Sequence, residues 1–222
     1  MKWWREDARI RVLRGGAPEP GGRCVAYWMQ RAQRALDNPA LETTVRTADE
    51  IGVPVVVFFA LLATHRVANL RHYTFMLEGL AETARRLKER RIGFVLRIVR
   101  AASAVQEFVA FCREVKAAVA VVDENPLRAS ARWRERAAAE LAVPLLAVDA
   151  DVIVPCALLG REHYAARTIR PRLNAMVGAY LKPVGNLIPA AAWRTSRHHA
   201  SREPATQLLA ELAIDRSVAP AD

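Results

Sequence analysis

Residues 24–62 read CVAYWMQRAQRALDNPALETTVRTADEIGVPVVVFFALL and decide the fold. The first six of these residues are rich in β-formers and follow the turn-forming segment GGAPEPGG, so they predict a strand. Asn38 is a good N-cap, Pro39 fits the first helical position, and Gly52 ends the helix. Residues 53–62 are apolar on both faces, as central strands of parallel sheets are. The stretch therefore predicts two parallel strands joined by a crossover helix.

The same alternation of strand and helix continues to residue 148. The clearest helix covers residues 70–88, where apolar residues step by three and four positions while charged residues face away. The other segments predict strands at 93–99, 117–122 and 144–148 and helices at 103–114 and 130–141. Crossovers of this length favour right-handed connections between parallel strands. The predicted fold class is α/β, a doubly wound, Rossmann-like five-stranded parallel sheet with helices on both faces, followed by a partly helical basic linker.

Composition excludes several classes of protein. The 222 residues are 52% apolar and 25% charged, which supplies a core and rules out disorder and low complexity. Three cysteines are too few for a disulfide framework, so we expect a reducing compartment. The N-terminal residues do not resemble a signal peptide, and the longest apolar run, 53–63, is too short to span the ~30 Å of a bilayer. We expect a soluble, cytoplasmic protein with no membrane contact and a net charge of +10.

The charge pattern divides the chain into three parts. We expect an N-terminal arm at 1–22, the α/β domain at 23–157 and a basic linker at 158–222. Residues 160–202 hold eight Lys or Arg and one acidic residue, a composition that disfavours a packed core. The linker either neutralises phosphates, with weak and salt-dependent affinity for DNA, or pairs with acidic groups of a partner domain. We expect it to be poorly ordered from Gly178 onward, with Tyr164, Ile169 and Leu173 docked on the sheet domain.

A ligand site is expected at the carboxyl ends of the strands, where the strand order of a doubly wound sheet reverses. If the first strand is central and the fourth is its neighbour, the crevice lies between residues 28–30 and 123–125. No GxGxxG motif follows the first strand and no GxxxxGK[ST] motif exists in the chain, which disfavours a dinucleotide or nucleoside triphosphate held by a glycine-rich loop. The histidines and cysteines lack the spacing of a metal site, so no metal is expected.

The segment YWMQRAQRALDNPAL at 27–41 resembles the opening of the α/β domain of the photolyase/cryptochrome family. It carries the element Arg-x-x-Asp-Asn-x-Ala-Leu, and with RIRVLRGG before it the chain is similar to class II cyclobutane-pyrimidine-dimer photolyases. Further matches follow in order at ANLRHYTFMLEGL (68–80), RRIGFVLR (90–97), NPLRASARWRE (125–135), VDADVIVPC (148–156) and YAARTIRPRL (164–173), and IDRSVAP resembles the linker before the flavin domain.

The resemblance implies a deoxyribodipyrimidine photolyase, a carbon–carbon lyase that repairs pyrimidine dimers in DNA with light. In related proteins this domain holds an antenna chromophore, an 8-hydroxy-deazaflavin or a folate, which passes excitation to a reduced FAD in a helical C-terminal domain. Such a pocket needs a flat apolar slot with a few orienting polar groups. The residues expected to bind the antenna are Trp28, Met29, Gln30, Phe59, Asp123 and Asn125.

The chain also departs from the family pattern. It stops at residue 222, before the FAD-binding helical domain, so no catalytic residue can be carried over and we expect the chain alone to be inactive and to bind no FAD. That domain, missing or separately encoded, is the expected partner, and damaged DNA would be reached only through it. Residues 59–70, FALLATHRVANL, replace the acidic and proline-bearing segment usual in the family, and Cys24 replaces an aromatic residue.

Two other hypotheses compete with a photolyase antenna domain. One is a stand-alone α/β module that binds a nucleotide-like or pterin/deazaflavin-like ligand, and the other is a remnant without function. A reading frame that continues beyond codon 222, or a neighbouring gene for the helical domain, would favour the photolyase. A terminator with neither would favour the other two.

Overall fold

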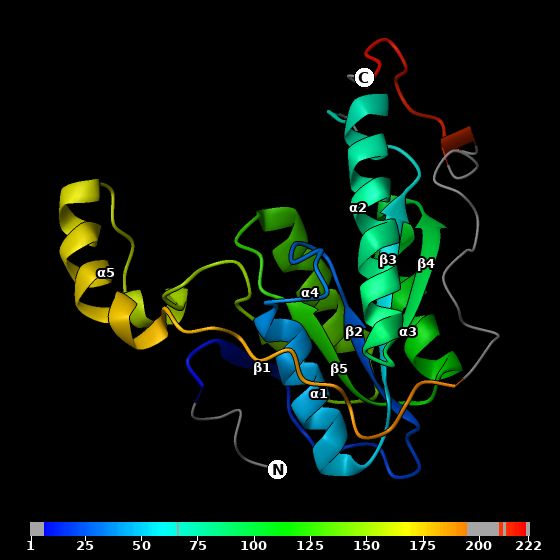
Figure 1. Ribbon diagram of the computed structural model, residues 1–222, viewed down its shortest axis with the longest axis horizontal. Coiled ribbons are helices and arrows are strands. Elements are labelled where there is room, and N and C mark those ends of the chain that lie inside the picture. The colour runs from blue at the N-terminus through cyan, green and yellow to red at the C-terminus, as the bar shows by residue number, and fades with distance from the viewer. Residues whose placement is uncertain (1–6, 66, 195–208, 211, 221–222) are drawn as a thin grey trace.

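The computed structural model describes residues 7–65, 67–194, 209–210 and 212–220. Its centre is a six-stranded sheet in the order β1-β6-β5-β2-β3-β4 (Figure 1). The strands are β1 (Ile10–Arg14), β2 (Cys24–Trp28), β3 (Val55–Leu62), β4 (Gly93–Val99), β5 (Ala117–Asp123) and β6 (Leu145–Val148). Strands β2 to β6 run parallel to one another, as the sequence predicts. The central β2 lies between β5 and β3, so the strand order reverses where the sequence places the crevice.

Strand β1 was not expected, because it lies in the segment predicted to be an arm. It pairs antiparallel with β6, with Ile10 opposite Val148. The turn that leads from β1 to β2 comes very close to β5, since a Cβ at Gly22 would lie 2.5 Å from the Cβ of Ala118. Glycine is therefore required at this position. The Pro/Gly-rich segment is a tight connection inside the sheet domain, and residues 10–14 belong to that domain.

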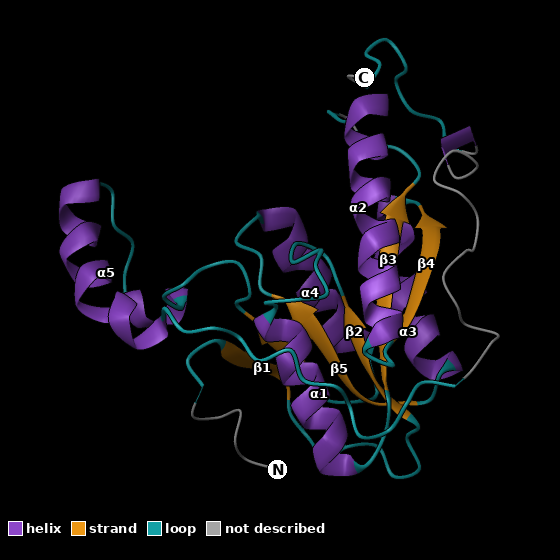
Figure 2. Ribbon diagram, in the orientation of Figure 1, coloured by secondary structure: helices purple, strands orange, loops and turns teal. Residues whose placement is uncertain are grey.

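Helices cover both faces of the sheet (Figure 2). The helices are α1 (Pro39–Ile51), α2 (Leu70–Glu89), α3 (Ala104–Glu114), α4 (Arg128–Glu140) and α5 (Ala166–Tyr180), with 3-10 turns at Ala101–Ser103 and Cys156–Leu159. Alternate residues of β2 enter opposite cores, because successive side chains of a strand point to opposite faces. Tyr27 packs with α1 and α2, whereas Trp28 packs with α3 and α4.

The N-termini of α1 and α2 are capped by asparagines. The Oδ1 atom of Asn38 accepts a hydrogen bond from the backbone N–H of Leu41 at 3.1 Å, and Gly52 ends α1 in the left-handed conformation with φ of 72°. Asn69 caps α2 together with His72 in a reciprocal capping box. The predicted limits of α1 are confirmed.

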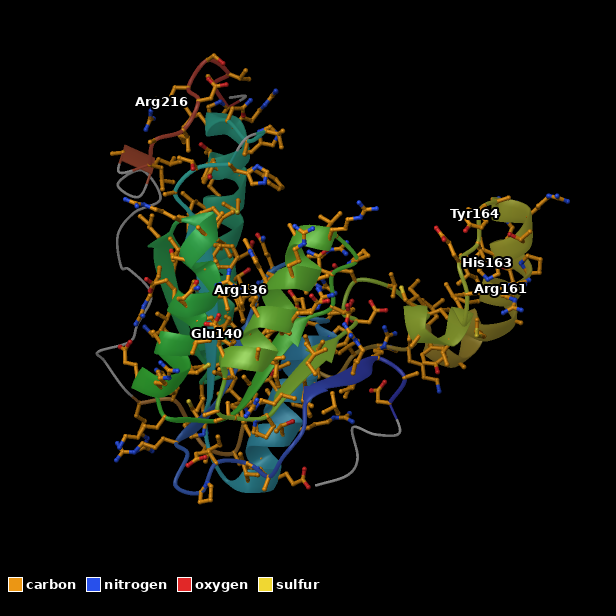
Figure 3. All side chains as sticks on the ribbon, turned by 180° about the vertical axis from the view of Figure 1, so that it is seen from behind. Arg136, Glu140, Arg161, His163, Tyr164 and Arg216 are labelled. Carbon is orange, nitrogen blue, oxygen red and sulfur yellow. The ribbon has the colours of Figure 1, made fainter. Side chains whose placement is uncertain are left out.

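Helix α5 stands away from the sheet (Figure 1). None of its residues is buried, and Tyr164 just before it is 88% exposed. Arg161, His163 and Tyr164 lie together beside this helix, remote from the sheet (Figure 3). The expectation that Tyr164, Ile169 and Leu173 dock on the sheet domain is therefore wrong. Arg172 donates a hydrogen bond to the carbonyl oxygen of Leu159 and so connects α5 with the turn that precedes it.

The chain after α5 returns to the α/β domain. The N–H of Leu187 donates to Glu42 at 3.0 Å, and the N–H of Trp193 donates to the carbonyl oxygen of Arg91 at 3.0 Å. Further along, Leu209 and Leu212 are buried in the core shared by α1 and α2. Much of the segment expected to be poorly ordered thus makes specific contacts, while residues 195–208 lie outside the described residues.

Candidate functional site

A cavity of about 350 Å³ opens over the carboxyl ends of β2 and β3. Its walls come from the end of β2 and the loop after it, the end of β3, the first turns of α2 and the start of α4. Because residues of both cores contribute, the cavity lies over the edge of the sheet. Its volume is in the range of small-molecule sites. The position is that expected for a ligand at a strand-order reversal.

Five of the six residues that the sequence analysis assigns to the site line this cavity. They are Trp28, Met29, Gln30, Phe59 and Asn125. They come from three parts of the chain separated by tens of residues, and the sheet brings them together. Asp123 is the exception and lies below the cavity floor formed by the loop after β2, where it has a different task.

One wall of the cavity is aromatic and rigid. The indole rings of Trp28 and Trp133 are stacked, with centroids 6.0 Å apart and planes 12° apart. Trp28 is only 1% exposed and also packs against Phe108 at a centroid distance of 4.8 Å. Stacked rings of this kind offer a flat apolar surface with little conformational freedom. The wall suits a planar ring system.

Gln30 supplies the polar groups that a ligand site needs for orientation. Both its Oε1 and its Nε2 are out of contact with solvent and hydrogen-bonded to no described residue. An unpaired buried amide costs about 1–3 kcal/mol per polar group. Because Gln30 lines the cavity, a ligand with a donor and an acceptor side by side would remove this cost. The amide is the strongest sign that the cavity is a binding site.

Asp123 holds the loop from which Gln30 projects. Its Oδ2 accepts hydrogen bonds from the backbone N–H groups of Gln30, Arg31 and Ala32 at 2.8, 2.7 and 3.0 Å. Its Oδ1 accepts one from the Tyr27 hydroxyl at 2.5 Å. With its oxygens so occupied and 1% of its surface exposed, Asp123 shapes the site from beneath.

Burial shifts the pKa values of Asp123 and Tyr27. Desolvation raises the pKa of Asp123 above its ordinary value, although the hydrogen bonds from Tyr27 and the three N–H groups act in the opposite direction. Burial and the neighbouring carboxylate also raise the pKa of Tyr27. The Tyr27 hydroxyl therefore stays protonated and remains a donor to Asp123.

Several lining residues were not assigned to the site from sequence. His72 and Met76 from α2 and Ser130 and Trp133 from α4 all line the cavity. Helical periodicity assigns such residues to a core or to solvent, and it does not show that two helices begin at the same edge of a sheet. The signal that was available is topological, because every helix that follows a parallel strand begins near that edge.

The segment after the middle of β3, which the sequence analysis singles out, forms part of the cavity. Residues 59–62 line it, as do His65 and Ala68. The Tyr73 hydroxyl donates to the carbonyl oxygen of Leu62 at 2.7 Å and fixes the end of β3. In the part of the chain that the structure describes, no three His, Cys, Asp or Glu side chains are grouped as metal ligands. None of the described helices is long and apolar enough to cross a membrane.

The sequence profile of the family described as DNA photolyase matches residues 25–190, more than half of the chain. The chain belongs to the DNA photolyase family. It is 34% identical over 177 residues to the deoxyribodipyrimidine photo-lyase of Methanothermobacter thermautotrophicus, covering 79% of this chain and 39% of that protein. It is 33% identical over 190 residues to the protein of the same name from Arabidopsis thaliana, covering 83% of this chain and 38% of that protein. The photolyase domain described here thus spans about two fifths of the length of these relatives.

Solved photolyases share the fold of this photolyase domain. One is the archaeal photolyase from Sulfolobus tokodaii with two FAD molecules, at a TM-score of 0.61 and 16% identity over 86% of this chain and 42% of that one. Another is the bacterial class III photolyase from Agrobacterium tumefaciens, at a TM-score of 0.62 and 16% identity over 86% of this chain and 39% of that one. At such identity the likeness concerns the fold alone.

Proposed function

We propose that this photolyase chain is a light-harvesting domain whose cavity binds an antenna chromophore of the 8-hydroxy-deazaflavin or folate type. The observation that carries the proposal is the unpaired, buried amide of Gln30 beside the stacked Trp28 and Trp133. A tricyclic or pterin ring has a flat face for the indoles and a lactam edge, a donor next to an acceptor, for the amide. The group, when bound, would absorb light and transfer excitation by dipole coupling.

The chain's own residues hold and orient the ring. Trp28 and Trp133 define its plane, Phe59 and Met29 close the apolar side, and Gln30 fixes its rotation in that plane. The rigid wall matters because dipole coupling depends on orientation, so a ring free to rotate would transfer less excitation. None of these residues acts as an acid, base or nucleophile in the proposal.

Repair of pyrimidine dimers in DNA is proposed for the assembly that this domain would form with an FAD-binding helical domain. The relatives named deoxyribodipyrimidine photo-lyase support this activity. The electron donor and the lesion pocket are assigned to the partner domain, and damaged DNA is reached through it. The chain alone should not repair dimers under blue light.

Membership of class II is part of the proposal. Its support is the set of ordered motifs, of which YAARTIRPRL at 164–173 is the most specific. The altered segment 59–70 forms part of the cavity, so the chromophore of this chain need not be that of other members. The Sulfolobus enzyme holds two FAD molecules, which implies a novel light-harvesting cofactor in that protein, so FAD must be included as a competing ligand in any test.

The test is titration of the purified chain with 8-hydroxy-5-deazariboflavin, methenyltetrahydrofolate and FAD, followed by absorption and fluorescence. We expect one of the first two to bind, and Gln30→Ala to raise its Kd about tenfold, because one hydrogen-bonding edge is worth about 1.4 kcal/mol. Gln106→Ala on the remote helix α3 is the matched control and should leave Kd unchanged. No binding by either chromophore would refute the proposal, and binding of FAD alone would replace it.

A further inference from the structure

The N-terminus of α4 opens onto the cavity without a cap. Leu127 precedes the helix and supplies no side-chain hydrogen bond. The first intrahelical bond runs from the N–H of Ala131 to the carbonyl oxygen of Leu127. The N–H groups of Arg128, Ala129 and Ser130 therefore have no acceptor among the described residues, and Ser130 lines the cavity. Free N–H groups at a helix N-terminus attract anions.

A second observation is independent of the helix. Asn125 lines the same cavity and is only 6% exposed. Its Oδ1 accepts the N–H of Leu127 at 3.0 Å, but its Nδ2 donates to no described residue. The buried amide of Gln30 is also unpaired. The Nδ2 of Asn125 and the free N–H groups at the start of α4 thus lie beside the Gln30 amide that the ring engages, and a ligand group rich in acceptors can pair with these donors.

The charges at this end of the cavity are uncompensated. Arg128 and Arg132 stand one turn apart on α4, both exposed and neither in an ion pair with a described residue, and the first turn of the helix holds no acidic residue. Glu124, four residues before Arg128, is already engaged by Arg11 and Arg134. Positive side chains at the positive end of a helix repel it. A bound anion would relieve this repulsion.

We propose that the start of α4, with Asn125, is a phosphate-binding subsite, and that the chromophore taken by the cavity is a phosphate ester. The inference rests on the proposed function, since the ring system occupies the aromatic part of the cavity and the phosphate extends from it to α4. A phosphate fits this place because its several oxygens can accept from the free N–H groups and from Asn125 Nδ2 together.

The experiment compares 8-hydroxy-5-deazariboflavin with its 5′-phosphate as ligands of the same chain. The ester should bind about tenfold more tightly or better at low ionic strength, since a few charge-assisted hydrogen bonds are worth at least 1.4 kcal/mol. The preference should shrink as salt is added. Arg128→Gln/Arg132→Gln should reduce it severalfold. The matched control is Arg167→Gln/Arg170→Gln, the same change of charge near the uncapped start of α5, which should leave the preference intact.

Ala129→Glu provides a variant in which folding is not at issue. Ala129 is exposed, and an acidic residue in the first helical turn stabilises a helix, so the melting temperature should be unchanged or higher. The preference for the ester should disappear, with the Kd of the unphosphorylated ligand unchanged. Equal affinities of the two ligands for the unmodified chain would overturn the phosphate subsite and leave the antenna function standing. Binding of neither would overturn the subsite, and the folate titration would then decide the function.

Discussion

Replacing Asp123 tests whether the loop after β2 is held from below. Asp123→Ala removes the single acceptor group for four donors, the buried Tyr27 hydroxyl and Ala32 N–H and the partly buried N–H groups of Gln30 and Arg31. Asp123→Asn keeps an oxygen for the three N–H groups and turns an NH₂ toward the Tyr27 hydroxyl, which can then accept. The two variants therefore differ mainly in how many donors are left unpaired.

The expected losses of stability follow from the number of donors left unpaired. A buried donor without a partner costs about 1–3 kcal/mol, but water entering the vacated space pairs with some of the four, and loss of a desolvated charge offsets part of the rest. We expect Asp123→Ala to cost about 4 kcal/mol, a large share of the roughly 5–15 kcal/mol that stabilises a domain. Its melting temperature should fall by roughly 10 °C, since about 1 kcal/mol shifts a domain of this size by 2–4 °C. Asp123→Asn should cost about 1–2 kcal/mol.

The assay pairs urea unfolding with chromophore titration. Asp123→Ala should bind the chromophore at least tenfold more weakly, because the backbone of Gln30 loses its anchor, whereas Asp123→Asn should stay within about threefold. Leu87→Ala is the control for stability, since it opens a cavity in the buried end of α2 at a cost of about 2–5 kcal/mol and leaves the loop alone. If Asp123→Ala matched Asp123→Asn in both measurements, the carboxylate would not be shaping the site.

Two further predictions concern the pH dependence of stability and the contact between Glu42 and the chain after α5. Folding raises the pKa of Asp123 above its ordinary 3.8. The stability that this shift contributes is therefore fully present below pH 3.8 and is lost as pH rises through the raised pKa. Urea unfolding at several pH values should show this loss, and Asp123→Asn should abolish it. Glu42→Gln leaves the buried Arg90 without its counter-ion, at a cost of about 3–5 kcal/mol. Hydrogen exchange at Leu187 should quicken, while Glu82→Gln in an exposed pair should change stability by under about 1 kcal/mol; equal effects of the two would contradict the role of burial.

The sheet and its helices could be predicted because their signals are local. The apolar residues of β3 and α2 repeat with the periods of a strand and a helix, and Asn38 and Gly52 mark the ends of α1. Strand β1 was missed because five residues of mixed charge and apolarity carry no such signal, and its place depends on β6, far away in sequence. The place of α5 was missed because its apolar residues suit any neighbour, and in the structure Arg172 joins the helix to the preceding turn.

The candidate site shows a similar limit. Topology alone placed Gln30 and Asn125 at the same edge of the sheet, and the structure brings them to one cavity. Topology could not distinguish the role of Asp123 from that of Asn125, since both are polar residues at the end of β5. The difference arises from the pleat and from the loop, which closes over Asp123 with three N–H groups and leaves Asn125 facing the cavity. Trp133 was missed because its partner, Trp28, lies on another element.

The segments that resemble the family supply the framework of the site and also much of the cavity lining. Asn38, from the Arg-x-x-Asp-Asn element, caps α1 and donates to the carbonyl oxygens of Ala32 and Arg34, so it fixes the loop that carries Gln30 without lining the cavity. Besides the end of β2 and the loop after it, the lining comes from residues 59–68 and from the starts of α2 and α4. Phe59, Ala60, Leu61, Leu62 and His65 are the lining residues that lie outside the segments that resemble the family. Exchanging residues 59–68 for the segment of a relative should alter which chromophore binds while leaving the fold intact.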